Sequence, residues 1–219
     1  MGLPVEINPL LLQSSSSGTS STISNSLRFR KTASASLSRT PASSGSNTTW
    51  TWSAWLKRGS LICSAFQNLF LSQTLGSSAN YAYFGIDYSS GYGNGVLVFE
   101  DFTSSASRGF VKTVATFLDT SAWYHIVLAV DTTQSTSSNR IKLYVNGTQI
   151  TTFSRTSYPS QNTDSPINQA IGHNIGRWPY TPTYFDGYIA EQNFIDGQAL
   201  TPSSFGSTNA ETGVWQPIK

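Results

Sequence analysis

Two stretches near the middle of the chain decide its fold: residues 123–131 read WYHIVLAVD, and residues 141–150 read IKLYVNGTQI. In the second stretch, apolar and polar side chains alternate up to Asn146-Gly147. An Asn-Gly pair between alternating runs is the strongest short-range signal for a β-hairpin, because both turn residues need positive φ. We therefore predict a hairpin at this pair, with a return strand over residues 148–153.

The same two-residue period recurs along most of the chain. Its clearest example is residues 49–57, TWTWSAWLK, in which Trp50, Trp52, Ala54 and Leu56 share one face. Clusters of Ser, Gly and Asn separate many short segments, which is typical of a sandwich or barrel. The one helical signal is a single turn at residues 201–205, with Thr201 as N-cap and Pro202 at the first position. We expect strands at 27–30, with 36–39 as a short partner, and at 49–57, 61–65, 69–73, 81–87, 95–99, 111–117, 124–130, 141–145, 148–153, 170–175 and 187–194.

Composition limits the class of protein. The chain has 219 residues, of which 38% are apolar, 13% aromatic and only 11% charged. One large all-β domain fits this length, and a surface of hydroxyls and amides is typical of extracellular or virion-surface proteins. The net charge of +2, with its basic residues scattered except at 28–31, gives no basic field for nucleic acid. No apolar run approaches the ~18 residues of a membrane-spanning helix, so we expect no membrane insertion.

Three motifs point to a family: WYH at residues 123–125, LYVNG at 143–147 and FDGYIAE at 185–191. Their order and spacing resemble the laminin-G-like branch of the concanavalin A-like lectin/glucanase superfamily, over roughly residues 26–206. The resemblance implies a two-sheet antiparallel jelly-roll sandwich that mostly serves binding. Together with an N-terminal arm, the chain is also similar to stand-alone laminin-G-like proteins of tailed bacteriophages, where the domain is a virion appendage.

Catalysis is not expected. The resemblance implies that an enzyme would carry the glucanase pattern Glu-x-Asp-x-x-Glu on one strand, with the carboxylates aimed at the sugar. The four glutamates are Glu6, Glu100, Glu191 and Glu211, and none stands in that spacing. On a strand, the adjacent Glu100 and Asp101 would face opposite ways.

The histidines and metal ligands give no stronger signal. His125 lies inside an apolar strand, and we interpret it as a hydrogen-bonded structural residue. No motif of closely spaced His, Cys and Asp ligands occurs, so we expect no cofactor. Calcium is the alternative, because several relatives use it; Asp131, Asn174 and Asp186 are the ligands that this chain would offer.

Aromatic residues in loops give the best binding-site hypothesis. Residues 177–184, RWPYTPTY, form a Pro-stiffened aromatic loop, and a Gly-rich loop at 89–95 is flanked by tyrosines. Flat aromatic faces stack on sugar rings, and rigid aromatics also anchor protein interfaces; the alternative is that they cap the end of the sandwich. The predicted ligand-binding residues are His173, Asn174, Arg177, Trp178, Tyr180, Tyr184, Tyr88 and Tyr92.

Residues 1–25 differ from the rest and are predicted to be a docking arm, with residues 26–219 forming the sandwich and a short tail. A Ser-rich run at 14–22 has the composition of a flexible linker. An edge strand packed on its own domain is the alternative. The predicted assembly residues of the arm are Val5, Ile7, Leu10, Leu11 and Leu12.

These observations lead to a non-catalytic structural protein of a phage virion, assembled in the host cytoplasm. As a tail-fibre or adhesin component, the aromatic loop would bind host surface polysaccharide, weakly per site and strongly through many copies. As a capsid decoration protein, the arm would clamp neighbouring shell subunits. A cellular carbohydrate-binding protein or glycoside hydrolase is the third hypothesis. Expected partners are other virion proteins and a homo-oligomer, with a trimer as one option; no nucleic acid is expected.

Overall fold

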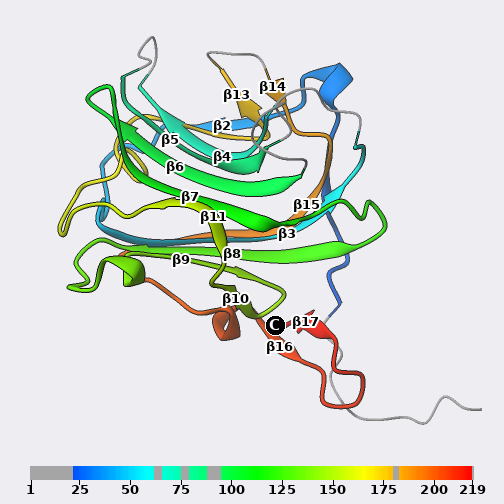
Figure 1. The fold of residues 1–219 in the computed structure, drawn as a ribbon. Coiled ribbons are helices and arrows are strands. Elements are labelled where there is room, and N and C mark those ends of the chain that lie inside the picture. The colour runs from blue at the N-terminus through cyan, green and yellow to red at the C-terminus, as the bar shows by residue number, and fades with distance from the viewer. Residues whose placement is uncertain (1–21, 62–65, 75–78, 88–94, 180–182, 219) are drawn as a thin grey trace, which may run out of the picture.

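A computed structural model describes residues 22–61, 66–74, 79–87, 95–179 and 183–218 of the protein (Figure 1). Within them, two antiparallel sheets pack face to face, which confirms the predicted sandwich. No helix among these residues is long and apolar enough to span a bilayer. The six-stranded sheet has the spatial order β1 (Leu27–Phe29), β15 (Gly187–Asp196), β3 (Thr49–Arg58), β8 (Trp123–Asp131), β9 (Ile141–Val145) and β10 (Thr148–Ile150). The seven-stranded sheet has the order β11 (Phe153–Ser157), β7 (Ala106–Thr116), β6 (Val96–Thr103), β5 (Tyr81–Asp87), β4 (Gln67–Gln73), β12 (Gly172–Ile175) and β2 (Leu37–Arg39).

The core lies between the two sheets and is built on the alternation of β3. Trp50, Trp52, Ala54 and Leu56 all point into it, as predicted. The two tryptophans are fully buried, and each meets a phenylalanine of the opposite sheet edge-on: Trp50 meets Phe99 at 5.8 Å and Trp52 meets Phe84 at 5.3 Å between ring centroids. Edge-to-face pairs at such distances add to the stabilisation from burial alone.

The Asn146-Gly147 hairpin is confirmed. Both residues have positive φ, 48° and 79°, and Val145 pairs with Thr148 directly across the turn. The Asn146 side chain also accepts a hydrogen bond from the backbone N–H of His125 at 2.8 Å. This ties the turn to β8, so the residue that permits the turn also fixes its place at the sheet edge.

The predicted return strand over 148–153 is wrong in its extent. β10 ends at Ile150, and Phe153 begins β11, which pairs with β7 in the other sheet. The chain therefore changes sheets at exposed Thr151 and Thr152, and nothing in the local alternation marks that change.

The predicted pairing of residues 27–30 with 36–39 is also wrong. β1 pairs with β15, and β2 pairs with β12 in the other sheet. A 3-10 turn at Lys31–Ala33, closed by Ser34 at φ 53°, carries the chain from one sheet to the other. The two strands thus face each other across an open edge of the sandwich.

A second tight hairpin escaped prediction. β6 and β7 are longer than expected because Thr103 pairs with Ala106 across Ser104 and Ser105, which have φ of 54° and 61°. A Ser-Ser pair carries no sequence signal for positive φ, so the extension could not be seen. The predicted strand at 61–65 lies almost wholly outside the described residues.

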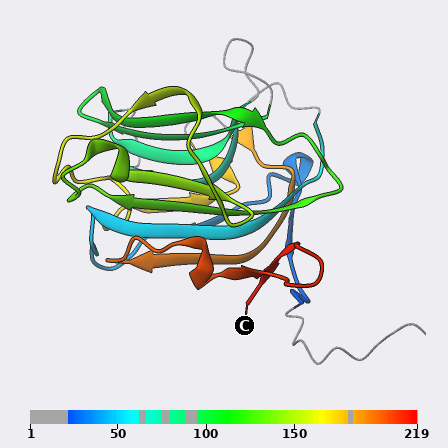
Figure 2. The same ribbon diagram turned by 60° about the horizontal axis from the view of Figure 1, so that its bottom comes forward.

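The C-terminal segment packs on the outer face of the six-stranded sheet, away from the core (Figure 2). The predicted turn is present as a 3-10 turn over Pro202–Ser204, although the Thr201 hydroxyl meets Ser203 and not the backbone. A hairpin of β16 (Gly206–Thr208) and β17 (Trp215–Pro217) follows, which the sequence did not predict.

His125 of β8 fastens this hairpin to the sheet. The Trp215 indole Nε1 donates to His125 Nδ1 at 3.0 Å, and the two rings stack 5.9 Å apart at 22°. The other ring nitrogen, Nε2, lies 2.9 Å from the Ser53 hydroxyl. His125 is 1% exposed. The residue is therefore buried with both ring nitrogens hydrogen-bonded, in agreement with a structural role.

Candidate functional site

The predicted aromatic loop is a two-stranded hairpin that lies against the outer face of the seven-stranded sheet. β13 (Arg177–Trp178) pairs with β14 (Thr183–Tyr184), and both strands contact β4. Figure 1 shows them above the hollow side of this curved sheet. Gly176 begins the hairpin at φ 78°, with the Phe29 ring so close that a Cβ would lie 2.5 Å from it. Only glycine satisfies both conditions, so this residue sets where the hairpin lies.

The hairpin brings Trp178 onto a group of aromatic rings that the sheet presents. The Trp178 ring lies 5.0 Å from Tyr83, 5.4 Å from Tyr81 and 6.2 Å from Phe66. Tyr81 in turn stacks on Phe102 at 4.8 Å with an interplanar angle of 12°. All members are half-buried, so their edges and faces reach the surface. We call this set the aromatic patch: Phe66, Tyr81, Tyr83, Phe102 and Trp178.

Hydrogen-bonding groups accompany the patch. The Tyr83 hydroxyl donates to Glu100 Oε2 at 2.9 Å. Burial, to which the Glu100 carboxylate adds, raises the pKa of Tyr83 well above its ordinary value and that of Tyr81 to about 12. Both phenols are protonated at neutral pH. Tyr83 gives its one proton to Glu100 and can accept a further hydrogen bond, whereas the Tyr81 hydroxyl can donate as well as accept.

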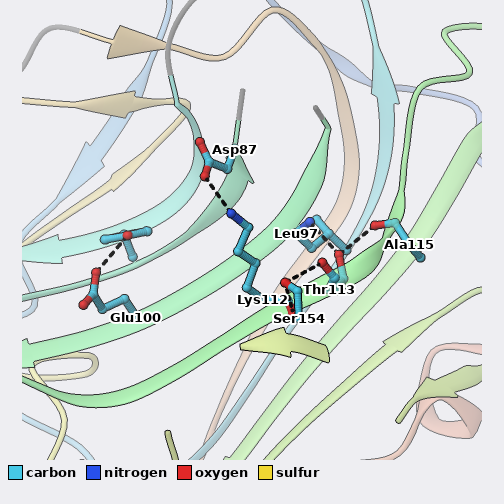
Figure 3. Close-up of polar contacts among 8 residues, drawn as sticks. Asp87, Leu97, Glu100, Lys112, Thr113, Ala115 and Ser154 are labelled. Atoms are coloured by element: carbon cyan, nitrogen blue, oxygen red, sulfur yellow. Dashed lines mark hydrogen bonds and ion pairs between the residues drawn. The ribbon is translucent and has the colours of Figure 1, made fainter. Parts of the chain in front are cut away.

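A buried ion pair lies further along the same face. Lys112 extends toward Asp87, with Nζ 3.6 Å from Oδ2, and both side chains are less than a tenth exposed (Figure 3). The ion pair lies on the same face of the sheet as Tyr83. Asp87 follows Tyr83 by four residues on β5, and Lys112 is opposite Val98, which is itself opposite Gly85 of β5. A buried pair of this kind contributes fixed charges to the face and little net stability.

One buried side chain beside the patch has unmet hydrogen-bonding capacity. Asn68 of β4 pairs with Gly85, and so shares its face with Tyr83. It is fully buried, and neither its Oδ1 nor its Nδ2 has a hydrogen-bond partner. The Phe66 ring lies over Gly85, 2.6 Å from where a Cβ would stand. Trp178 Nε1 and Thr183 Oγ1 in the hairpin are likewise buried without partners. Unmet polar groups of this kind indicate a place for water or a ligand.

The structure divides the predicted ligand-binding residues. Arg177, Trp178 and Tyr184 meet in the hairpin, and Asn174 shares its face because it pairs with Leu71, the partner of Tyr83. His173 does not join them. It directly precedes Asn174 on β12, so its side chain points to the opposite face of the sheet. Tyr88, Tyr92 and Tyr180 lie outside the described residues, as do the arm residues Val5, Ile7, Leu10, Leu11 and Leu12.

Sequence reasoning missed most of the patch. Tyr81 and Tyr83 alternate with Ala82, Phe84 and Ile86, which point into the core. That alternation was a usable signal that the tyrosines face outward on a buried strand. No signal in the sequence linked them to Trp178, which is far along the chain.

The adjacent carboxylates Glu100 and Asp101 are not arranged as a catalytic pair. Glu100 faces Tyr83, whereas Asp101, one residue on, pairs with Ala82 and is buried on the opposite face, as predicted. Burial raises the pKa of Asp101 to about 6. Glu191 and Glu211 are exposed elsewhere.

The three oxygen ligands considered for calcium are also kept apart. Asp131 pairs with Thr49 at one end of β3, while Asp186 binds Arg28 at 2.8 Å near the other end. Among the residues that the structure describes, no three His, Cys, Asp or Glu side chains gather into a group that could hold a metal ion.

Comparison with solved structures identifies the fold as the concanavalin A-like sandwich. The chain matches the SAP-like pentraxin of Limulus polyphemus (13% identity, TM-score 0.50, 84% of this chain and 76% of that one). It matches NanB sialidase of Streptococcus pneumoniae at 15% identity and TM-score 0.54, over 85% of this chain and 29% of the sialidase. Domain 4 of AbnA, an arabinanase from Geobacillus stearothermophilus solved with arabinotriose, is 23% identical, with TM-score 0.49 over 72% of this chain and 65% of that domain. At these identities the likeness concerns the fold alone.

Family membership follows from the sequence match. The Laminin_G_3 model, described as the concanavalin A-like lectin/glucanases superfamily, matches residues 30–204. The chain belongs to this family, in agreement with the resemblance found in its motifs. The search among curated proteins returned no match.

Proposed function

We propose that this chain is a non-catalytic carbohydrate-binding domain that holds glycan on the aromatic patch. One observation carries the proposal: half-buried rings lie on one face with tyrosine hydroxyls and the Glu100 carboxylate, and the buried, unpaired Asn68 amide shares that face. Rings stack on the apolar faces of sugars, while such polar groups select hydroxyls. Membership in a lectin/glucanase superfamily supports the same chemistry.

The test is binding of the full chain to an array of bacterial surface polysaccharides, followed by titration of the best ligand. Trp178→Ala should lower affinity about tenfold or more, a loss of about 1.4 kcal/mol. Trp123→Ala is the matched control, because Trp123 is 37% exposed on the other sheet. Trp178→Phe should recover part of the affinity. Equal binding by wild type and Trp178→Ala would show that the patch is not the site.

The opposite orientation of Glu100 and Asp101 supports a binding role without hydrolysis. Product analysis of the bound polysaccharide should therefore find no shortened chains after prolonged incubation. Release of oligosaccharides that is lost in Glu100→Gln would overturn this part of the proposal and restore the hydrolase hypothesis.

We further propose that the domain serves as a tail-fibre or adhesin component of a phage virion. Low charge, a surface of hydroxyls and amides, and the apolar N-terminal arm support this setting. Cryo-electron microscopy of intact particles tests it. Density at the tail, with the 177–184 hairpin outward, is expected. Density over the shell would instead make the chain a decoration protein, and its absence from particles would overturn both virion roles.

A further inference from the structure

A cavity lies at the open edge of the sandwich, on the other side of β12 from the aromatic patch. It has a volume of about 610 Å³ and opens between β2 and β12 of one sheet and β15 of the other. The loop at residues 41–45 lines it from outside the sheets. This volume lies within the range of small-molecule sites.

The floor of the cavity is aromatic. Phe70 lies 5.7 Å from Phe194 and 5.8 Å from the His173 ring. His173 Nε2 accepts from the backbone N–H of Asn168 at 3.0 Å, and Nδ1 lies 2.9 Å from the carbonyl oxygen of Ile171. Both ring nitrogens are therefore engaged, so His173 offers a ligand only its ring face.

The rim of the cavity carries one carboxylate and one guanidinium, and they differ in their hydrogen bonding within the protein. Asp196 Oδ1 already accepts two hydrogen bonds, from Ser46 N at 2.8 Å and Asn168 Nδ2 at 2.7 Å. Arg39 pairs with His173 across the ladder, so its side chain shares the cavity face. In the described part of the chain, no hydrogen bond or ion pair engages its guanidinium.

This difference between Asp196 and Arg39 favours a negatively charged ligand. The carboxylate of Asp196 has donors from the protein, whereas the guanidinium of Arg39 lacks an acceptor. A planar guanidinium recognises a carboxylate through two parallel N–H···O bonds. The free oxygen of Asp196 and the amide of Gln192, which also lines the cavity, suit hydroxyl groups.

We propose that this cavity is a second binding site, specific for a sugar that bears a carboxylate. The carboxylate binds Arg39, the apolar face of the sugar ring lies on Phe194 and His173, and ring hydroxyls meet Asp196 and Gln192. The inference takes its ligand class from the proposed carbohydrate-binding function but uses a different set of residues, so the two can fail separately.

The experiment is an amide-NMR titration of the full chain with glucuronate, galacturonate and N-acetylneuraminate, against glucose and galactose as neutral counterparts. At least one acidic sugar should shift the signals of β2, β12 and residues 192–196. Its neutral counterpart should bind at least tenfold more weakly. Arg39→Gln should weaken the acidic sugar at least tenfold, Arg39→Lys less so, and Trp178→Ala should leave it unchanged.

Other outcomes overturn the inference. These are shifts confined to the hairpin, equal binding of neutral and acidic sugars, unchanged affinity in Arg39→Gln, or no response to any acidic sugar at millimolar concentration. Arg39 is exposed on an edge strand, so its substitution is expected to leave the fold intact. Matching spectra of the unliganded variant and wild type check this. If Trp178→Ala loses polysaccharide binding while Arg39→Gln loses nothing, the patch stands and the cavity does not.

Discussion

Acid should weaken the attachment of the C-terminal hairpin, because His125 must stay neutral to hold it. Trp215 Nε1 can only donate, so His125 Nδ1 must accept, and protonation of Nδ1 would set two donors against each other. Burial lowers the pKa of His125 from 6.5 to about 4. The folded state therefore binds fewer protons than the unfolded state between these two values.

The sign and size of the effect follow from proton linkage. A lowered histidine pKa leaves stability intact above pH 6.5 and reduces it as the pH falls toward 4. A pH of 5 lies about 1.5 units below the pKa of the histidine in the unfolded state, so the free energy of unfolding falls by about 2 kcal/mol. Asp101 acts in the opposite sense: its raised pKa, about 6, means that protonation on acidification favours the folded state. The wild-type profile alone would mix His125 with Asp101 and with His173, whose pKa burial also lowers.

The measurement is therefore a difference between two proteins. Urea unfolding of wild type and His125→Gln, followed by tryptophan fluorescence at several values from pH 7.5 to pH 5, gives two free-energy profiles. Asp101 and His173 contribute equally to both and cancel. The stability advantage of wild type over the variant should shrink by about 2 kcal/mol between pH 7.5 and 5. A difference that stays constant across this range would refute the linkage of His125 to the hairpin.

Other predictions concern particular contacts. Gly147→Ala should destabilise the fold by about 2 kcal/mol or more in urea unfolding, because φ is 79° and a Cβ would lie 2.5 Å from the Trp215 ring. Gly213→Ala, at φ 69° with open space around it, should cost only the backbone strain, about 1 kcal/mol; equal losses would rule out the contact with Trp215. Thr113→Val should cost about 1–3 kcal/mol, because the hydroxyl accepts from Leu97 N–H at 3.0 Å and donates to the Ala115 carbonyl at 2.8 Å where the β6–β7 register shifts (Figure 3). Equal stability of Thr113→Val and wild type would show that the Thr113 hydroxyl does not compensate for the backbone hydrogen bonds that are missing at that bulge.

Some features followed directly from local sequence. The alternation in residues 49–57 placed Trp50 and Trp52 in the core, and the Asn-Gly pair gave the turn at 146–147. These successes share one cause: the positive-φ demand of a turn and the side-chain period of a strand act within a few residues.

Other features depended on neighbours that are distant in sequence. In β8, Val127 and Ala129 are buried although they face away from the core, because Phe205 from the C-terminal segment covers them. The apolar run at residues 126–130 does not show which segment of the chain covers its outer face. The aromatic patch likewise joins Trp178 to Tyr81 and Tyr83 through a hairpin laid over β4.

The sequence by itself determined that the chain is all-β, that Trp50, Trp52, Ala54 and Leu56 face the core, and that a turn stands at Asn146-Gly147. Tertiary structure alone decided that β1 and β2 belong to different sheets, that Trp178 lies on Tyr81 and Tyr83, and that Arg39 and Asp196 border one cavity. The physical reason is that alternation fixes a side chain relative to its own strand. Which strand lies opposite is fixed only when the two sheets pack, through contacts between residues far apart in the chain.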